Sequence, residues 1–295
     1  MKLGIWFAVG SLNNTFLDKY GDRWYAGLEE IKKVYDQGKF TYYKFDMVNL
    51  NNYDDLESLM GMARKFIQYS GHSTRINWDV TELEARTGYY FGRDLGNIYL
   101  ANRKSKLGKS VVYVPYIMLR DAWQVSKYVN LNKFQVSIQN IDETDREVSN
   151  GHLYNHPYSV AIALMGSPLF FQETHYYSKE ARDQIRPLLK VYKQHRNEMF
   201  KGYVFPIGNE PDDRSWTGFQ NYYPEANSGY LMVFRELYNS KANHRIQLRF
   251  LSGKTIHMTN LVTGKSSTVR TDPNGFADFT IDKPADFLYL KYEVR

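Results

Sequence analysis

The chain has 295 residues, 43% of them hydrophobic, and contains no cysteine. This hydrophobic content is enough for a packed core, which excludes an intrinsically disordered or collagen-like chain. Without cysteine the protein forms no disulfide, no thiolate zinc site and no iron–sulfur cluster. The 38 basic and 32 acidic residues leave a net charge of +6. These charges are scattered along the chain, so we expect a solubilising surface and no nucleic-acid partner.

No apolar run approaches the roughly 20 residues that a membrane-spanning helix needs, so we expect no membrane partner. Residues 1–9 lack the apolar region and the small-residue cleavage site of a secretory signal, and they predict a strand instead. The compartment stays open, because a longer parent polypeptide, periplasmic or secreted, would carry its own signal. Aromatic residues reach 16%. Rings that carry a polar group suit amphipathic ligands such as sugars.

The first two-thirds of the chain alternates short apolar segments with longer amphipathic ones. The apolar segments predict six strands, at 2–9, 40–47, 74–80, 96–101, 133–138 and 167–172. The segments between them predict helices near 16–36, 53–69, 112–129, 156–165 and 177–200. Such alternation is typical of parallel βαβ units. We expect an α/β fold that forms most of a (β/α)₈ TIM barrel, with the active site at the carboxyl ends of the strands. A doubly wound sheet is the alternative, although no glycine-rich phosphate turn follows the first strand.

After about residue 200 the pattern changes to closely spaced strands without helices between them. These strands are predicted at 202–208, 216–223, 229–237, 244–250, 254–262, 266–271, 275–281 and 286–293. Short strands separated by turn residues are typical of an all-β antiparallel sandwich. We therefore divide the chain into a partial barrel at 1–200 and a sandwich at 201–295.

Lys44 and Asp46 stand two residues apart at the end of the second predicted strand. Residues at that spacing point to the same face of a strand. A desolvated pair of charges is costly without a purpose, and the ammonium would keep the carboxylate ionised. A positioned, ionised carboxylate is the nucleophile that retaining glycosidases use. A purely structural ion pair at the barrel rim is the alternative.

Asn77, Trp78 and Asp79 end the third predicted strand, and Glu82 and Arg86 follow on the next loop. If the second and third strands are neighbours, the carboxylates of residues 46 and 79 lie roughly 5–10 Å apart. This range includes both retaining and inverting separations. Asp79 therefore either takes part in catalysis directly, or caps a loop or orients Arg86.

Two other motifs carry less weight. Residues 107–110 resemble the end of a phosphate-binding loop, but Arg103 occupies the position of its first glycine. His152 and His156 have a spacing that suits zinc on a helix, but Pro157 should push the second histidine out of helical geometry, and no third ligand is evident. We therefore expect neither a metal nor an organic cofactor.

Several segments together resemble the α-galactosidase-like retaining glycoside hydrolases (clan D). Leu3 to Phe7, and then Lys44-Phe45-Asp46, resemble the third and fourth barrel strands of that family. Further segments are similar to its fifth strand with an arginine-bearing loop, its entry into strand eight, its last helix and an early sandwich strand, at 77–89, 163–169, 189–196 and 228–235.

The resemblance covers nearly the whole chain and implies a mechanism. It makes Asp46 the nucleophile of a retaining double displacement at α-glycosidic bonds, without a cofactor. It also implies that an oligosaccharide or glycoside substrate is held by Lys44, Trp6, Asn77, Trp78, Arg86 and Asn102.

The sequence departs from the family pattern at two places. The sixth strand of the family carries the general acid, but residues 98–103 hold no carboxylate, and Asn102 cannot protonate a leaving group. Asp79, Glu82, Glu84 or Glu173 would then substitute, or the protein is a non-catalytic carbohydrate binder or an inactive fragment. Barrel strands one and two are also missing. We expect the N-terminal part of the same polypeptide, or a second copy, to fill that gap.

Overall fold

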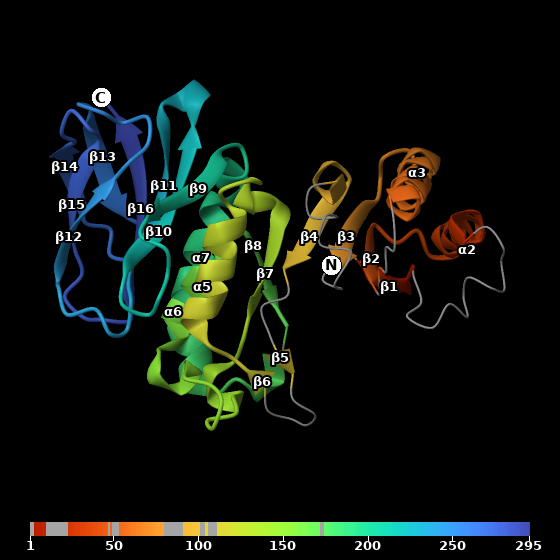
Figure 1. Cartoon of the computed structure of the whole chain (residues 1–295), viewed down its shortest axis with the longest axis horizontal. Helices are drawn as coiled ribbons and strands as arrows, with labels where there is room; N and C mark the ends of the chain where they lie inside the picture. Colours follow the sequence, from red (N-terminus) through yellow and green to blue (C-terminus); the bar gives the residue numbers. More distant parts are fainter. Residues whose placement is uncertain are drawn as a thin grey trace. The chain divides into compact units, whose positions relative to one another are not determined.

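A computed structural model of the chain describes residues 3–9, 23–46, 48, 53–79, 91–100, 104–105, 111–171 and 174–295. The chain forms two compact units. The first unit comprises Met1–Ala101 and Lys133–Gln135, and the second comprises Asn102–Asn132 and Val136–Arg295. Figure 1 shows the elements of each unit, coloured along the sequence.

The first unit contains four parallel strands with helices between them. Its elements are β1 (Gly4–Ala8), α2 (Arg23–Gly38), β2 (Tyr42–Asp46), α3 (Tyr53–Tyr69), β3 (Arg75–Asp79), η2 (Gly92–Asp94) and β4 (Gly96–Leu100). The strands follow the order β1-β2-β3-β4, each pairing in parallel with its neighbour. The sequence predicted these four strands and both helices, and the parallel arrangement is confirmed.

Alternation along β2 divides the sheet of the first unit into an apolar face and a polar face. Tyr43 and Phe45 are fully buried. The Tyr43 ring lies 4.8 Å from Phe66 of α3, measured between ring centroids, and Phe66 in turn contacts Tyr35 of α2. The two helices therefore cover the apolar face. The alternate residues of β2, which include Lys44, point to the other face.

The second unit begins with further helices and two more parallel strands. Its elements before residue 200 are β5 (Lys104–Ser105), β6 (Val111–Val112), α5 (Pro115–Val125), η4 (Ile141–Glu143), η5 (Gly151–Leu153), α6 (His156–Ala163), β8 (Ser167–Phe170), η6 (Thr174–Tyr176) and α7 (Lys179–Met199). Two elements, η3 (Leu131–Lys133) and β7 (Phe134–Ile138), are divided between the two units, because Lys133–Gln135 belong to the first. Strands β7 and β8 are neighbours. Parallel strands, as in half of a barrel, are therefore present, whereas the described residues do not form a closed eight-stranded barrel.

One helix start and one expectation about a histidine differ from the prediction. Helix α5 was expected from residue 112 but begins at Pro115, because proline lacks the N–H that a helix interior needs and favours an extended residue before it. The expectation that Pro157 keeps His156 out of helical geometry is wrong, because His156 is the first residue of α6. Proline is tolerated there, since the first turn of a helix has no intrahelical acceptors for its N–H groups. His152 lies in η5, so the two histidines do not share a helix.

The remainder of the second unit is antiparallel. Its strands are β9 (Tyr203–Gly208), β10 (Trp216–Tyr223), β11 (Ser228–Arg235), β12 (Asn243–Gln247), β13 (Thr255–Asn260), β14 (Ser266–Arg270), β15 (Phe276–Thr280) and β16 (Asp286–Val294). Six strands form one sheet in the order β14-β13-β16-β11-β10-β9, and β12 pairs with β15 in a second sheet. Side chains of both sheets, such as Trp216, Leu231, Ile246 and Phe279, share one buried core. The predicted antiparallel strands are therefore present.

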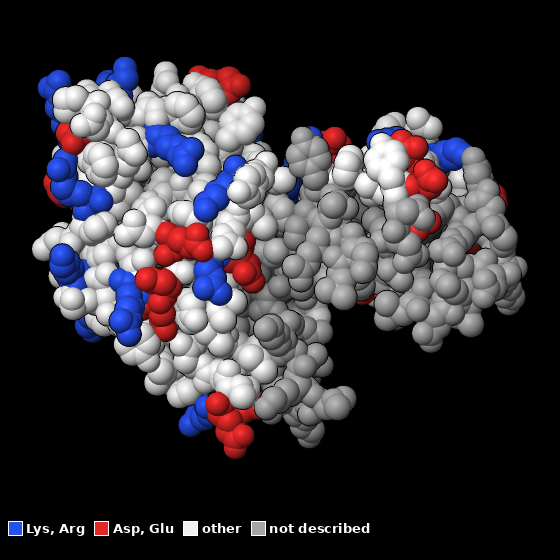
Figure 2. All heavy atoms as spheres, in the orientation of Figure 1, with Lys and Arg blue, Asp and Glu red and all other residues white. Residues whose placement is uncertain are grey.

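The surface of the second unit mixes charges of both signs. Figure 2 shows Lys and Arg side chains interspersed with Asp and Glu over the visible face of this unit. Among the helices that the structure describes, none is long and apolar enough to cross a membrane.

Candidate functional site

The polar face of the first unit brings together side chains from neighbouring strands. Trp6 of β1 pairs in register with Lys44 of β2, and Lys44 pairs with Asn77 of β3. Asp46 and Asp79 lie two residues further along β2 and β3, towards the carboxyl ends. They are therefore on the same face, because side chains alternate between the two faces of a strand. Four of the residues predicted from sequence are linked here by a chain of contacts, which runs from Trp6 to Asp46, then to Lys44 and then to Asp79.

Lys44 lies at the centre of this group and contacts both carboxylates. Its Nζ lies 2.6 Å from Oδ2 of Asp79 and 3.0 Å from Oδ2 of Asp46. The same ammonium lies over the ring of Tyr99, 4.5 Å from its centroid. The lysine and both carboxylates are mostly shielded from solvent, with side-chain exposures of 24%, 22% and 9% for Lys44, Asp46 and Asp79. One partly buried cation therefore joins β2 to β3.

Lys44 stays protonated at neutral pH. Burial by itself lowers the pKa of the ammonium, but the hydrogen bond and charge of Asp79, followed by those of Asp46, outweigh burial and raise the pKa above its ordinary value. A raised pKa means that the folded state holds the proton more tightly than the unfolded state. The resulting stabilisation is complete below the pKa of the unfolded lysine and is lost as pH rises through that of the folded one.

Trp6 supplies a second donor to Asp46. The indole Nε1 donates a hydrogen bond of 2.6 Å to Oδ2, the oxygen that also contacts Lys44. Two donors on one oxygen fix the orientation of the carboxylate. The side chain of Trp6 is nevertheless 52% exposed. Part of the indole is therefore available to a ligand that approaches the carboxylate.

Trp78 is not brought together with these residues. It is completely buried on the opposite face, where its ring packs edge-on against Phe45 with 5.4 Å between centroids. Gly92 of η2 lies directly against this indole, since a Cβ at that glycine would come within 2.9 Å of it. Asn77 points to the polar face but is 1% exposed. The structure thus places Trp78 in the core of the unit, away from the polar face.

Five other predicted residues lie outside the described part of the chain. They are Glu82, Glu84, Arg86, Asn102 and Glu173. Their roles as acid, arginine clamp or substrate ligand stay predictions.

Sequence reasoning missed two aromatic residues of the polar face. Tyr99, opposite Asp79 in register, provides the ring beneath the Lys44 ammonium. Tyr42 shares its face with Lys44, and its hydroxyl accepts a hydrogen bond of 3.3 Å from Gln135. The alternation of side chains along a strand could have identified both residues. Residue 42 shares a face with Lys44, and residue 99 shares a face with Asn97, which pairs in register with Asn77.

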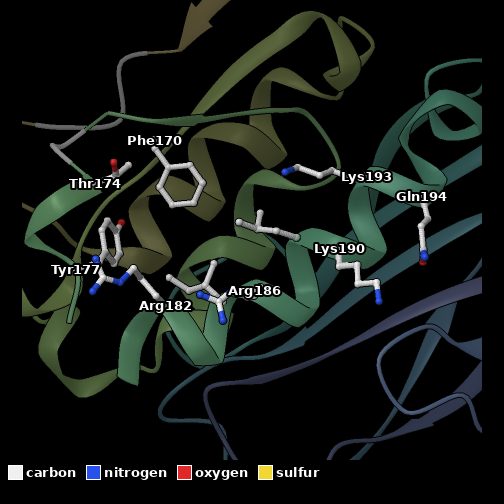
Figure 3. A pocket seen from close by; sticks show the side chains of 10 residues that line it. Phe170, Thr174, Tyr177, Arg182, Arg186, Lys190, Lys193 and Gln194 are labelled. Carbon is white, nitrogen blue, oxygen red and sulfur yellow. The ribbon is translucent and has the colours of Figure 1, made fainter. Parts of the chain in front are cut away.

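A cavity elsewhere in the chain has different chemistry. It has a volume of about 610 Å³ and lies between β8, η6 and α7. Figure 3 shows the ring of Phe170 at its wall, with Arg182, Arg186 and Lys190 extending from α7. None of the described residues that line it is Asp or Glu. The described part of its lining therefore differs from the polar face of the first unit, which carries two carboxylates.

Comparisons with known proteins find similar folds among solved structures but no match in sequence. No protein-family model matches the chain. No curated protein matches it in sequence either. Solved structures do match. The galactosidase domain of the α-galactosidase–sucrose kinase AgaSK superposes with a TM-score of 0.69 at 14% identity, over 100% of this chain and 44% of that one.

Two further structures extend the comparison. The GH36 α-galactosidase AgaA from Geobacillus stearothermophilus, in complex with stachyose, has a TM-score of 0.65 at 9% identity, over 100% of this chain and 45% of AgaA. An α-amylase from Anoxybacillus has a TM-score of 0.56 at 12% identity, over 99% of this chain and 70% of that one. The chain spans less than half the length of the two α-galactosidases. It has the fold of the carboxyl-terminal portion of these enzymes, as the sequence resemblance predicted.

Proposed function

We propose that this chain is part of a retaining α-glycoside hydrolase of the α-galactosidase type. Residues 1–200 would supply part of a catalytic barrel, residues 201–295 its sandwich, and another polypeptide segment the remaining barrel strands. The observation that carries the proposal is the convergence of two donors on one carboxylate oxygen of Asp46, at the carboxyl end of a parallel strand. In parallel α/β barrels that end of the strands is where active sites form. The fold shared with α-galactosidases supports the same substrate class.

The geometry suits Asp46 as the nucleophile. A carboxylate attacks the anomeric carbon while the bond to the leaving oxygen breaks, which forms a glycosyl ester that water then hydrolyses. The attacking group must be ionised and oriented. Lys44 favours the ionised form by its charge, and the indole of Trp6 fixes the orientation. The half-exposed indole would also contact the sugar.

Asp79 suits a different role. A general acid must hold a proton before the leaving group departs. The ammonium of Lys44, 2.6 Å from Asp79, favours the ionised carboxylate instead. We therefore assign Asp79 to positioning Lys44, and the acid to one of the other candidates, Glu82, Glu84 or Glu173. Arg86 and Asn102 stay proposed substrate ligands, together with Asn77.

A covalent probe tests the nucleophile directly. An α-galactose-configured cyclophellitol aziridine forms an ester with the nucleophile of retaining enzymes, which intact-protein mass spectrometry detects. We expect the adduct in the unsubstituted protein and in the control variant Asp94→Asn. This control alters a carboxylate of the same unit that is 79% exposed. We expect no adduct in Asp46→Asn. Circular dichroism of each variant checks that the fold is retained.

The labelling experiment also distinguishes a hydrolase from the second candidate function, a non-catalytic carbohydrate binder. The contact between Asp79 and Lys44 favours that function, because it leaves the described part of the polar face without a protonated acid. Binding of raffinose by calorimetry, with no adduct in the parent protein, would support the binder. An adduct that persists in Asp46→Asn would remove Asp46 from the mechanism.

A further inference from the structure

Phe250 has a backbone conformation that bulky residues rarely adopt. Its φ is +63°, in the left-handed region that glycine or asparagine occupies at much lower cost. Its side chain is 67% exposed, so the hydrophobic free energy gained by burying the ring offsets little of the backbone strain. A strained residue with an exposed aromatic ring points to a function other than packing.

The surrounding structure holds Phe250 in this conformation. The side chain of Gln220 in β10 makes two hydrogen bonds to the backbone of the preceding Arg249. Its Nε2 donates to the carbonyl oxygen at 3.0 Å, and its Oε1 accepts from the backbone N–H at 2.8 Å. On either side of this pair, Leu248 and Leu251 are anchored in the sandwich core, each 1% exposed. The segment is therefore fixed at three points, and the ring of Phe250 is directed outward.

The Phe250 ring belongs to a cluster of aromatic side chains. It stacks on Tyr222 with 5.3 Å between centroids and an interplanar angle of 23°, and it meets Phe205 edge-on at 5.8 Å. Tyr203, which is 61% exposed, pairs in register with Tyr222. One face of the Phe250 ring is thus packed on Tyr222. We name these four rings the aromatic platform; two of them come from the start of β9 and one from the end of β10, which lie at the same end of the sheet (Figure 1).

Polar groups lie beside the exposed rings. The guanidinium of Arg249 lies 5.5 Å from the centroid of Phe205, and Arg249 is itself exposed. Tyr203 adds an exposed phenol. An arginine presents five N–H donors and a phenol can donate or accept, which matches the hydroxyl groups of a sugar. The apolar C–H face of a pyranose packs against an aromatic ring in the same arrangement.

We propose that the aromatic platform is a glycan-binding site for a neutral pyranose chain, separate from the site at Asp46. The ring of Phe250 would stack on one sugar, and Arg249 and Tyr203 would bind its hydroxyls. A protein partner would need a contact of about 800 Å² on each side, whereas only two rings of this cluster are more than half exposed. The choice of a neutral glycan rests on the proposed function of the chain.

Affinity electrophoresis in gels that contain a polysaccharide tests this site. Galactomannan presents α-galactosyl groups and soluble starch presents α-glucose, so the two gels distinguish the sugar. We expect the parent protein to be retarded in at least one gel. We expect Phe250→Asn and Tyr203→Ala to weaken the apparent affinity at least fivefold. Tyr238→Ala should leave it unchanged, because Tyr238 is an aromatic of similar exposure, 58%, outside the platform.

The choice of asparagine separates binding from packing. Asparagine tolerates positive φ, so Phe250→Asn should melt at or above the temperature of the parent protein while it loses retardation. A parent protein retarded in neither gel, or unchanged retardation in Phe250→Asn, would overturn the proposal. The result is independent of the covalent probe. If the probe labels Asp46 but no polysaccharide binds, only the glycan-binding role of the aromatic platform is rejected. If polysaccharide binding depends on Phe250 but the probe forms no adduct, only the role of Asp46 as nucleophile is rejected.

Discussion

Glu236 is a buried carboxylate of the second unit that no cation within the described contacts neutralises. It is completely buried, and its Oε2 accepts backbone N–H bonds from Asp212 at 3.1 Å and from Ser215 at 2.7 Å. Burial raises the pKa of Glu236 to about 7, although these backbone hydrogen bonds lower it. The carboxyl group therefore titrates near neutral pH in the folded protein and near its ordinary value in the unfolded one.

This difference predicts a pH-dependent stability. Because the folded pKa is raised, the contribution of Glu236 is most favourable at low pH and is lost as pH rises towards and through 7. Glu236→Gln cannot titrate and keeps an oxygen for the two N–H groups. We expect the free energy of unfolding of the variant, relative to the parent protein, to rise by up to about 3 kcal/mol between pH 5 and pH 8. Urea unfolding at several pH values between 5 and 8 measures this difference. If the free energies of unfolding of the two proteins change in parallel with pH, the raised pKa of Glu236 is contradicted.

At the residue scale the sequence predicted one half of the candidate site. The spacing of Lys44 and Asp46 on a strand was sufficient to place them on one face, and the structure brings them within 3.0 Å. The shorter contact, between Lys44 and Asp79, depends on the register between β2 and β3. Register follows from long-range packing, which spacing along a single strand does not contain. The same reason explains why Trp78 was expected near the sugar, since alternation alone did not say which face the helices cover.

At the element scale, the pairing of β3 with β4 depends on a glycine. A Cβ at Gly96 would lie 1.8 Å from the carbonyl oxygen of Ile76, its partner in the register. No rotamer change can relieve a clash with a backbone atom. By contrast, Gly61 lies inside α3 with nothing within 4 Å of the corresponding position.

These two glycines form a matched pair for mutation. We expect Gly96→Ala to lower the free energy of unfolding by at least roughly 1–3 kcal/mol, because β3 and β4 must separate. Gly61→Ala should raise it by about 0.5–1 kcal/mol, because alanine loses less backbone entropy in a helix. Thermal or urea unfolding of both variants measures the difference. Equal effects of the two substitutions would show that β3 and β4 are not as closely paired as described.

The elements themselves were predicted well where periodicity is strong. Helix α3 was expected at the bounds that it has, because it combines an apolar stripe with acidic residues in its first turn. Short elements were missed. The hairpin of β5 and β6, which has two residues in each strand, was not predicted, and the helix expected from residue 112 included the second residue of β6. Two-residue strands have no period to detect, so only their pairing across the hairpin defines them.

At the scale of the whole molecule, stability should differ sharply between strands of the same sheet. All eight residues of β11 are buried, and the strand lies between β10 and β16. Strand β14 lies at the end of the sheet order and is mostly exposed. Central, buried hydrogen bonds open only with global unfolding, whereas edge bonds open locally.

Hydrogen exchange would measure this contrast. We expect the amides of Ser228–Arg235 to exchange slowest in the second unit, and those of Ser266–Arg270 to exchange at least tenfold faster. Mass spectrometry of peptic fragments resolves both segments. Comparable protection of the two strands would mean that the sheet opens only as a whole. The sequence predicted both strands but not their order, because antiparallel neighbours in this sheet are often distant in the chain.

The position of β16 has a consequence for synthesis on the ribosome. This strand, the nine residues Asp286–Val294, pairs with β11 on one side and with β13 on the other. A nascent chain that ends at residue 285 therefore holds two half-sheets, β9-β10-β11 and β13-β14, whose facing edges are both unpaired. Unpaired edges invite pairing with other chains. The larger sheet can therefore be completed only after β16 has emerged from the ribosome, and until then both edges stay open to pairing with another chain.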